Sequence, residues 1–171
     1  MEKIQITMNI NGKACDVLVA PNDTLLEILR DELDLTGSKE SCGEGVCGSC
    51  TVQMDGKPVR SCLTLALEAQ GCRIKTVEGL AHGDTLSDLQ QSFIDHGAVQ
   101  CGFCTPGMLM SADALLKNDP APDEEAVKKA LSGNICRCTG YSKILEAVCH
   151  AGNPQEHCPD CNHHSATGKG E

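Results

Sequence analysis

Apolar side chains occupy every second position at the start of the chain, which predicts two β-strands. The alternation runs over residues 4–10 and returns at Val17 and Val19, with the two-residue period of strands that bury one face. Asn11 and Gly12, between the two runs, are the residue pair that a tight hairpin turn favours. The opening of the chain is therefore predicted to form an antiparallel hairpin.

The spacing of apolar residues then changes to three and four, which predicts a helix. Asp23 or Thr24 precedes the first apolar residue and is the predicted N-terminal cap. Gly37 follows the last one and is the predicted stop signal. The predicted apolar face comprises Leu25, Leu26, Ile28, Leu29 and Leu33.

Three short strands are predicted next, and the first two are expected to pair through a second favoured hairpin turn, Asp55-Gly56. The predicted strands are residues 51–54, 57–61 and 74–77. Hairpin, helix, hairpin and strand together predict an α+β domain over residues 1–77.

Helical spacing replaces strand spacing in the second half of the chain. The predicted helices are one with Leu86, Leu89, Phe93 and Ile94 as apolar residues and Asp84 or Thr85 as cap, then Pro106–Leu116, Asp123–Leu131 and Ser142–Val148. Residues 78–151 are therefore predicted to form a small helical bundle. Residues 152–171 are polar and aperiodic, and we expect them to be a disordered tail.

Thirteen of the 171 residues are cysteine, a content that indicates either a disulfide framework or metal and redox chemistry. A short secreted chain with this content would carry a disulfide framework. The first residues, MEKIQITMNI, lack the apolar core of a secretory signal and have the alternation of a strand. We therefore expect a cytoplasmic protein whose thiols stay reduced, where dense cysteine indicates metal or redox chemistry.

Composition argues against two other classes of protein. The formal net charge is −10, whereas a nucleic-acid-binding protein needs a basic surface. No run approaches the roughly 18 apolar residues of a membrane-spanning helix. The chain has two Phe, one Tyr and no Trp, so its cores are expected to be thin and to benefit from a metal site.

Three cysteines and three glycines fall within residues 41–50, SCGEGVCGSC. The spacing Cys42-x4-Cys47-x2-Cys50, followed by Cys62, is that of plant-type [2Fe–2S] proteins. Four thiolates have to converge on a small cluster, and glycines let the loop turn inward and direct backbone N–H groups at the sulfur atoms. The alternative is a zinc site with four cysteines, but zinc prefers two C-x2-C pairs. The spacing therefore favours iron and sulfide.

Two further cysteine pairs lie in the second half, Cys101-x2-Cys104 and Cys136-x-Cys138. Side chains two residues apart on a regular helix point about 200° apart, so a C-x-C pair that acts together needs an irregular loop. The sequence NICRCTG is of this kind. By spacing alone, the two pairs are compatible with a zinc ion or with an iron–sulfur cluster.

Taken in order, the segments CGEGVCGSC, QCGFCTPG and GNICRCTGY make the chain resemble the small iron–sulfur subunits of the molybdenum hydroxylases. This is the xanthine oxidase family, which includes xanthine dehydrogenase, carbon monoxide dehydrogenase and aldehyde oxidoreductases. The resemblance covers residues 3–150. It implies a plant-ferredoxin-like (β-grasp) domain followed by an all-α four-helix-bundle domain, each with one [2Fe–2S] cluster. The two halves predicted from apolar spacing agree with this arrangement.

The resemblance also implies which residues hold the two clusters. The ferredoxin-like cluster, on the side of the flavin, would be held by Cys42, Cys47, Cys50 and Cys62. The helical-domain cluster, next to the molybdopterin cofactor, would be held by Cys101, Cys104, Cys136 and Cys138. Gln100 and Cys138 match family positions that contact the pterin. The alternative for Gln100 is an ordinary polar residue at the end of a helix.

The function that the resemblance implies is an electron relay, with no bond chemistry on this chain. A large partner subunit would carry molybdopterin and hydroxylate the substrate, and a medium partner subunit would carry FAD. The resemblance also implies a dimer of such heterotrimers. A purine or another N-heterocycle is the first expectation for the substrate, with an aldehyde or carbon monoxide as alternatives.

Two other functions stay open. One is a free-standing ferredoxin-like electron carrier with two clusters. The other is a zinc-stabilised interaction module without a redox role. Colour separates it from the relay and from the free-standing carrier, because zinc sites are colourless and [2Fe–2S] proteins are red-brown.

Five cysteines are left without a predicted cluster role. Cys15 and Cys149 have the spacing of core residues, and Cys72 falls in a predicted turn. The other two lie in the tail, among histidines. These tail residues are His157, Cys158, Cys161, His163 and His164. We expect only incidental metal affinity there, with an extra zinc or iron site as the alternative, since a single C-x2-C pair is a weak signal.

Overall fold

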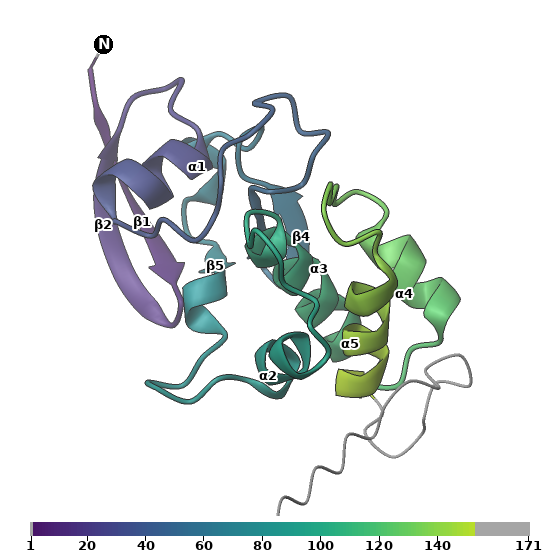
Figure 1. The fold of residues 1–171 in the computed structure, drawn as a ribbon. Helices are drawn as coiled ribbons and strands as arrows, with labels where there is room; N and C mark the ends of the chain where they lie inside the picture. The colour runs from purple at the N-terminus through teal and green to yellow at the C-terminus, as the bar shows by residue number, and fades with distance from the viewer. Residues whose placement is uncertain (1, 153–171) are drawn as a thin grey trace, which may run out of the picture.

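A mixed five-stranded sheet forms the N-terminal part of the molecule, seen in a computed structural model that describes residues 2–152 (Figure 1). Its strands are β1 (Ile4–Ile10), β2 (Lys13–Val19), β3 (Thr51–Met54), β4 (Lys57–Arg60) and β5 (Arg73–Lys75). They lie in the order β2-β1-β5-β3-β4. β1 pairs parallel with β5, and the other neighbours pair antiparallel. This arrangement is consistent with a ferredoxin-like domain.

Two tight turns set the register of the sheet. Asn11 and Gly12 have φ values of 52° and 85°, and Asp55 and Gly56 have φ values of 50° and 83°. Positive φ at both central residues is what the commonest two-residue hairpin turn requires, and Asn-Gly and Asp-Gly pairs accept it readily. Both predicted hairpins are confirmed. Strand β5 begins and ends slightly before the predicted strand 74–77.

The first helix begins where the sequence predicts and ends earlier. It consists of α1 (Leu25–Glu27) and the π-helical turn η1 (Ile28–Glu32). Thr24 is the N-cap and forms a capping box with Glu27. The wide π turn closes at Leu33, and Asp34 then takes a positive φ of 55°. Gly37, the predicted stop signal, therefore lies beyond the end of this helix, because the π turn and the left-handed residue end it first.

The inner face of the sheet and the first helix enclose one apolar core. Its buried members are Ile6, Met8, Ile10, Val17, Val19, Leu25, Ile28, Leu29, Val52, Ala66, Ala69 and Ile74. Alternate residues of β1 and β2 contribute to it, as the period of two predicts. Short 3₁₀ helices connect the strands and lead out of the sheet; they are η2 (Ala66–Ala69) and η3 (Val77–Gly79).

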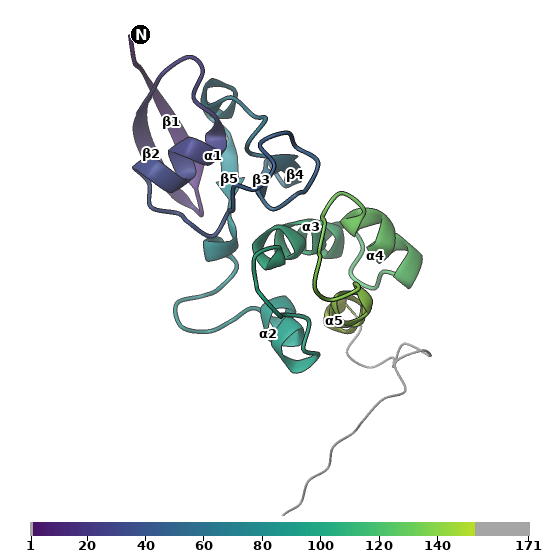
Figure 2. The same cartoon turned by 45° about the horizontal axis from the view of Figure 1, so that its top comes forward.

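Helices form the rest of the described chain and lie to one side of the sheet (Figure 2). They are α2 (Asp88–Asp95), α3 (Thr105–Asn118), α4 (Glu124–Leu131) and α5 (Ser142–Gly152). Their apolar faces meet in a second core, which includes Phe93, Met108, Met110, Val127, Leu131, Ile144 and Val148. Within residues 2–152, no helix combines the length and apolar composition that crossing a membrane requires.

The start of α2 differs from the prediction. Ser87 caps this helix in a capping box with Gln90, so the prediction of Asp84 or Thr85 as the cap is wrong. Thr85 instead exchanges backbone hydrogen bonds with His82 in a small turn. Helix α4 ends at Leu131 as predicted and has Asp123, the predicted first residue, as its N-cap, while α3 and α5 run slightly past their predicted C-terminal ends.

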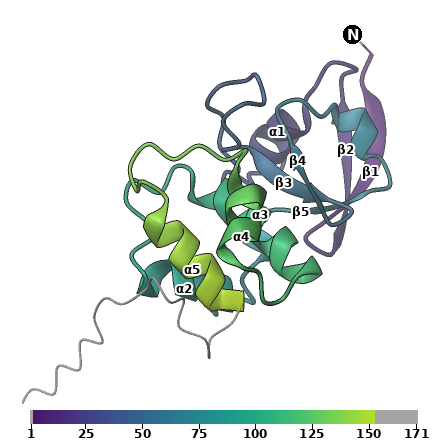
Figure 3. The same ribbon diagram turned by 90° about the vertical axis from the view of Figure 1, so that its right-hand side faces the viewer.

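Helix α3 lies beside the sheet (Figure 3), and a partly buried polar network attaches it there. Gln53 of β3 is 1% exposed, and its amide donates to the Asp113 carboxylate of α3 at 2.7 Å. The ammonium groups of Lys75 and Lys117 lie 3.2 and 2.8 Å from the same carboxylate. Burial alone would raise the pKa of Asp113, but the surrounding ammonium and amide donors bring it below its ordinary value.

Replacing Asp113 by Asn is expected to weaken the attachment of α3 to the sheet. Two lysine side chains would lose their counter-charge, and hydrogen bonds to charged groups contribute about 1.5–3 kcal/mol each. We expect the free energy of unfolding to fall by about 2 kcal/mol, measured as a shift of the denaturant midpoint.

The lowered pKa of Asp113 determines how the loss of unfolding free energy in Asp113→Asn depends on pH. A depressed carboxylate pKa stabilises the fold above the unfolded-state value of about 4, and the stabilisation is lost only as pH falls through the folded-state pKa. The deficit should therefore be equal at about pH 6 and about pH 8. Asp84→Asn, at an exposed carboxylate, is the control and should change stability by less than about 0.5 kcal/mol. An Asp113→Asn deficit as small as the control's would contradict the role of the network.

Candidate metal centres

The β3–β4 hairpin and the segment before it bring together a first group of four thiols. Cys50 immediately precedes β3 and Cys62 follows β4, so the antiparallel register of the hairpin sets the two side by side. Their sulfur atoms lie 3.3 Å apart. Cys42 and Cys47 come from residues 41–50, which we call the first loop.

Glycines give the first loop the backbone that the sequence predicts. Gly43, Gly45 and Gly48 have φ values of 65°, 75° and 73°, a region that residues with side chains rarely adopt. In this conformation the N–H of Glu44 donates to the sulfur of Cys42 at 3.4 Å. The loop therefore directs a backbone donor at a candidate ligand.

The surroundings act in opposite directions on the thiols of the first group. Backbone N–H groups of Cys47 and Glu44 lower the pKa of the Cys42 thiol to about 6. Burial, followed by the neighbouring Cys50 thiol, raises the pKa of Cys62 to about 11. Two thiolates in contact repel each other unless a positive charge lies between them. A coordinated metal ion supplies that charge, and the thiols that bind it are deprotonated.

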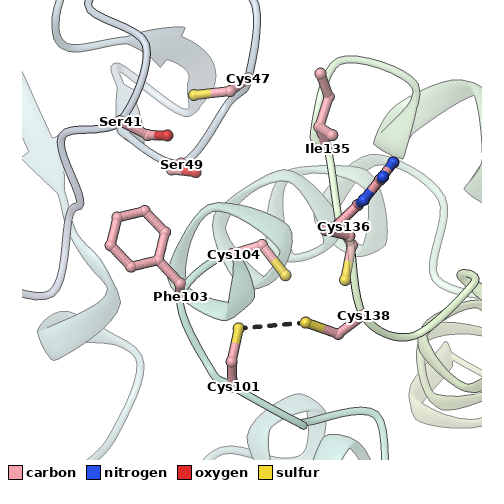
Figure 4. Close-up of a pocket in the computed structure, with 10 residues that line it drawn as sticks. Ser41, Cys47, Ser49, Cys101, Phe103, Cys104, Ile135, Cys136 and Cys138 are labelled. Carbon is pink, nitrogen blue, oxygen red and sulfur yellow. Dashed lines mark hydrogen bonds between the residues drawn. The ribbon is translucent and has the colours of Figure 1, made fainter.

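A second group of four thiols lies where two irregular segments face each other (Figure 4). Cys101 and Cys104 come from the segment before α3. Cys136 and Cys138 come from residues 133–140 between α4 and α5, which we call the second loop. The sulfurs of Cys101 and Cys138 are 3.6 Å apart, and those of Cys104 and Cys136 point into the same space. The irregular backbone that the C-x-C pair requires is confirmed.

Burial distinguishes the thiols of the second group. Cys136 is 9% exposed, whereas Cys101 and Cys138 are exposed. Burial and the adjacent Cys136 thiol raise the pKa of Cys104 to about 12. Burial also acts to raise the pKa of Cys136, but hydrogen bonds from Thr139 and from the Cys138 N–H bring it below its ordinary value. One member of the group is thus already placed where a thiolate is favoured.

The two loops meet at one cavity of about 220 Å³. The second group lines it, together with Cys47 and Ser49 of the first loop and with Phe103, Ile135 and others. Cys101 and Cys138 of the second group are exposed at the surface, so a partner molecule can reach this group.

The donors of both groups fit [2Fe–2S] clusters. The eight cysteines are free thiols, and sulfur contacts of 3.3 and 3.6 Å are too long for disulfide bonds. Within residues 2–152, no three His, Cys, Asp or Glu side chains converge closely enough to hold a single metal ion. Four free thiols in each group match the four-cysteine ligand set of a [2Fe–2S] cluster.

Hydrogen bonds tie the second loop to the first. The N–H of Ile135 donates to the Cys47 carbonyl at 2.8 Å. Asn134 is 2% exposed, and its side-chain amide donates to the Gly48 carbonyl at 3.0 Å. The bond at Ile135 connects the residue beside Cys136 directly to a cysteine of the first group. The two groups of thiols are therefore joined by a short covalent and hydrogen-bonded path.

Arg60 of β4 makes a further tie between the loops. Its guanidinium donates to the Gly133 carbonyl at 2.7 Å, to the Thr51 hydroxyl at 2.8 Å and to the Gly45 carbonyl at 3.3 Å. Sequence patterns indicate neither Arg60 nor Asn134 as a site residue, because spacing does not distinguish a buried polar side chain from a solvated one. The place of Asn134 inside the GNICRC segment is the only available signal.

The remaining predicted residues lie outside these contacts. Gln100 is exposed and does not line the cavity, so its contact with a pterin stays a prediction. Cys15 and Cys72 pack against the sheet core, and Cys149 packs against the helical core. The cysteines and histidines of the tail lie outside the described residues.

Two thiol groups on glycine-containing loops, one beside a sheet and one among helices, define an iron–sulfur protein of the [2Fe–2S] class. Residues 8–96 match the family model described as a 2Fe-2S iron-sulfur cluster binding domain. Residues 76–149 match the family model described as a [2Fe-2S] binding domain.

Similarity to known proteins narrows the class to one family. The chain is 50% identical over 151 residues to the nicotinate dehydrogenase small FeS subunit of Eubacterium barkeri, covering 88% of this chain and 96% of that one. It is 52% identical over 150 residues to the nicotine 6-hydroxylase small subunit of Paenarthrobacter nicotinovorans, covering 88% and 90%. A chain in the crystal structure of quinoline 2-oxidoreductase from Pseudomonas putida 86 matches with a TM-score of 0.85 at 48% identity, covering 92% of this chain and 100% of that one.

The chain therefore belongs to the small [2Fe–2S] subunits of the molybdenum hydroxylase family, and the resemblance seen in its sequence is confirmed. It is an iron–sulfur subunit of an oxidoreductase.

Replacing Gly48 by Ala is expected to separate the two loops. A Cβ on Gly48 would lie 2.4 Å from the Gly133 carbonyl oxygen, and the residue has a φ of +73°. We expect the variant to retain less iron per chain and to exchange the amide hydrogens of residues 133–136 faster, measured by metal analysis and by hydrogen–deuterium exchange of the purified protein.

Gly43→Ala in the same loop is the matched control. Its φ is +65°, but its Cβ would meet nothing within 4 Å. Both variants carry the left-handed backbone cost of about 1–2 kcal/mol, so only the contact with the second loop differs between them. Equal iron loss and equal exchange in both variants would contradict the role of that contact.

Proposed function

We propose that this chain carries electrons from a molybdenum centre on one partner subunit to FAD on another. The observation that carries the proposal is the pair of four-thiol groups joined by the hydrogen bond between Ile135 and Cys47. Each [2Fe–2S] cluster, when bound, would take up and release one electron. The names of the relatives support the proposal, since they are small or FeS subunits of a dehydrogenase and a hydroxylase.

Four cysteines would hold each cluster. The first would be held by Cys42, Cys47, Cys50 and Cys62, and the second by Cys101, Cys104, Cys136 and Cys138. The sulfur contacts between Cys50 and Cys62 and between Cys101 and Cys138 support their assignment as ligands of the same cluster in each group.

We place the second group beside the molybdopterin of a large subunit, with Gln100 and Cys138 in contact with the pterin. Cys101 and Cys138 are exposed beside the cavity, and Phe103 and Ile135, which also line it, are 44% and 53% exposed. Exposed thiols surrounded by apolar side chains suit a surface that a partner covers.

The first group would face a medium, FAD-binding subunit. Val46 and Leu63 are each 61% exposed and are the neighbours of Cys47 and Cys62 in the sequence. Large apolar side chains in contact with water beside two candidate ligands support a protein partner there. The complete assembly would be a dimer of heterotrimers.

We assign residues 1–77 to a ferredoxin-like domain and residues 78–151 to a four-helix-bundle domain, with residues 152–171 as a tail without cluster ligands. Two separate apolar cores support the division. One is built from residues within 6–74 and the other from residues within 80–148.

The substrate of the complex would be an N-heterocycle, a purine or a related ring. The names of the relatives support this class, because nicotinate, nicotine and quinoline each contain a nitrogen heterocycle. The large subunit would select the substrate, so an aldehyde or carbon monoxide would need no change in the proposed role of this chain. We place the complex in the cytoplasm, where thiols stay reduced.

Replacing Cys138 by Ser is expected to damage one cluster only. The wild-type complex, purified natively, should contain about four irons per chain and show two distinct [2Fe–2S] signals by EPR after reduction with dithionite. The variant should lose or alter one signal, and electrons from molybdenum should no longer reach the flavin, measured as flavin bleaching by stopped flow. Cys72→Ser, at a thiol outside both groups, is the control and should leave both signals unchanged.

Each other outcome has a distinct meaning. Full iron, both signals and normal flavin reduction in Cys138→Ser would contradict the ligand assignment. Zinc without an EPR signal in the wild type would contradict the iron–sulfur assignment itself. Two clusters with neither molybdenum nor flavin in the purified protein would favour a free-standing two-cluster carrier.

A further inference from the structure

The hydroxyl of Thr139 lies 3.1 Å from the sulfur of Cys136 and donates a hydrogen bond to it. Among residues 2–152, it is the one side-chain hydroxyl that donates to any of the eight candidate ligand sulfurs. Thr139 follows the C-x-C pair directly, and the irregular second loop turns its side chain back onto the group.

A neighbouring backbone N–H restricts the orientation of this hydroxyl. The N–H of Tyr141 donates to the Thr139 hydroxyl oxygen at 3.2 Å. A hydroxyl has one proton and two lone pairs. Because one lone pair accepts from Tyr141, the proton stays available for the sulfur of Cys136. The contact with Tyr141 therefore restricts the rotation of the hydroxyl and is compatible with donation to the sulfur.

Tyr141 is itself held in an uncommon backbone conformation. Its φ is 70°, in a region that large side chains seldom adopt and that the surrounding contacts have to maintain. Its side-chain oxygen accepts from the Cys136 N–H at 2.9 Å and donates to the Asn134 carbonyl at 3.3 Å. The residue that orients Thr139 is thus anchored on the same loop through both its backbone and its ring.

We propose that Thr139 is a positioning residue that raises the reduction potential of the cluster at the second group of cysteines. Adding one electron makes a cluster and its sulfur ligands more negative, so a proton aimed at a ligand sulfur stabilises the reduced form more than the oxidised form. Thr139 keeps its proton, and only the electron, supplied by the reductant, is added. This inference rests on the proposed role of Cys136 as a ligand.

The first group provides the contrast. Within the described part of the chain, its sulfur atoms receive backbone N–H donors, such as those of Cys47 and Glu44 at Cys42, but no hydroxyl donor. A backbone donor is set by the path of the chain, whereas a hydroxyl can be gained or lost by one substitution. Thr139 therefore sets part of the difference in potential between two clusters with the same four-thiolate ligation.

The test is an EPR-monitored redox titration of the intact complex carrying Thr139→Val, which keeps the shape of the side chain and removes the hydroxyl. We expect the midpoint of one cluster to fall while the other stays in place. The ratio of reduced to oxidised cluster should change by up to about tenfold at a given potential, which is about 59 mV for a one-electron couple. Thr139→Ser keeps the hydroxyl and should restore the wild-type midpoint.

Thr64→Val is the matched control. Thr64 follows Cys62 by two positions, but its hydroxyl donates to the Arg60 carbonyl at 3.0 Å and not to a sulfur. The same substitution is thus made near a cluster without removing a donor to it, and both midpoints should stay at their wild-type values.

The outcomes separate this inference from the proposed function. Unchanged midpoints in Thr139→Val, or equal shifts of both clusters, would overturn it. If Thr139→Val loses the cluster, Thr139→Ala repeats the titration, and a lowered midpoint at full iron content supports the proposal. Loss of the cluster in both variants but not in Thr139→Ser would assign the hydroxyl a structural role and overturn it. A wild-type complex without two [2Fe–2S] signals would be a failure of the proposed function instead.

Discussion

The close approach of three backbone segments is the constraint on which both metal centres depend. A Cβ on Gly107 of α3 would lie 2.2 Å from the Gly48 carbonyl oxygen, and a Cβ on Gly48 would lie 2.4 Å from that of Gly133. Real Cβ atoms do not approach so closely, so only glycine permits the contact. The approach also brings Asn134 and Ile135 within hydrogen-bonding distance of the first loop. Glycines in distant parts of the sequence thus fix the relative position of the two thiol groups.

Helix α3 transmits this constraint to the rest of the fold. Its N-cap is Cys104, its first turn contains Gly107, and Ser111 one turn later donates to the side chain of Asn134 at 2.8 Å. Near its middle, Asp113 accepts from Gln53 and the lysines of the sheet–helix network. One helix therefore positions a candidate ligand, supports the second loop and fastens the helical half to the sheet. Damage to its packing should reach the metal sites as well as the stability of the fold.

Local chemistry could be read from the sequence, and contacts between distant segments could not. Asn11-Gly12 predicts its hairpin because the required φ values are properties of those two residues. The spacing of cysteines indicates metal ligands because a cluster demands thiolates at short range. No local pattern indicates the roles of Gly107 and Asn134. Both are required by contacts with the Gly48 carbonyl, which lies some 60 to 90 residues away in the sequence. The early end of the first helix at Leu33 depends likewise on a π turn that its apolar spacing does not indicate.

The two thiol groups differ in their hydrogen-bond donors because they lie in different kinds of structure. The first loop contains left-handed glycines, which free backbone N–H groups to point at Cys42. The second group lies on two irregular segments, where the backbone N–H groups of Thr139 and Cys138 point at Cys136. The Thr139 hydroxyl adds a side-chain donor to them, which no sulfur of the first group receives within residues 2–152. When two clusters with the same four-cysteine ligation are bound, unequal hydrogen-bond donors at their sulfur atoms would make their reduction potentials unequal.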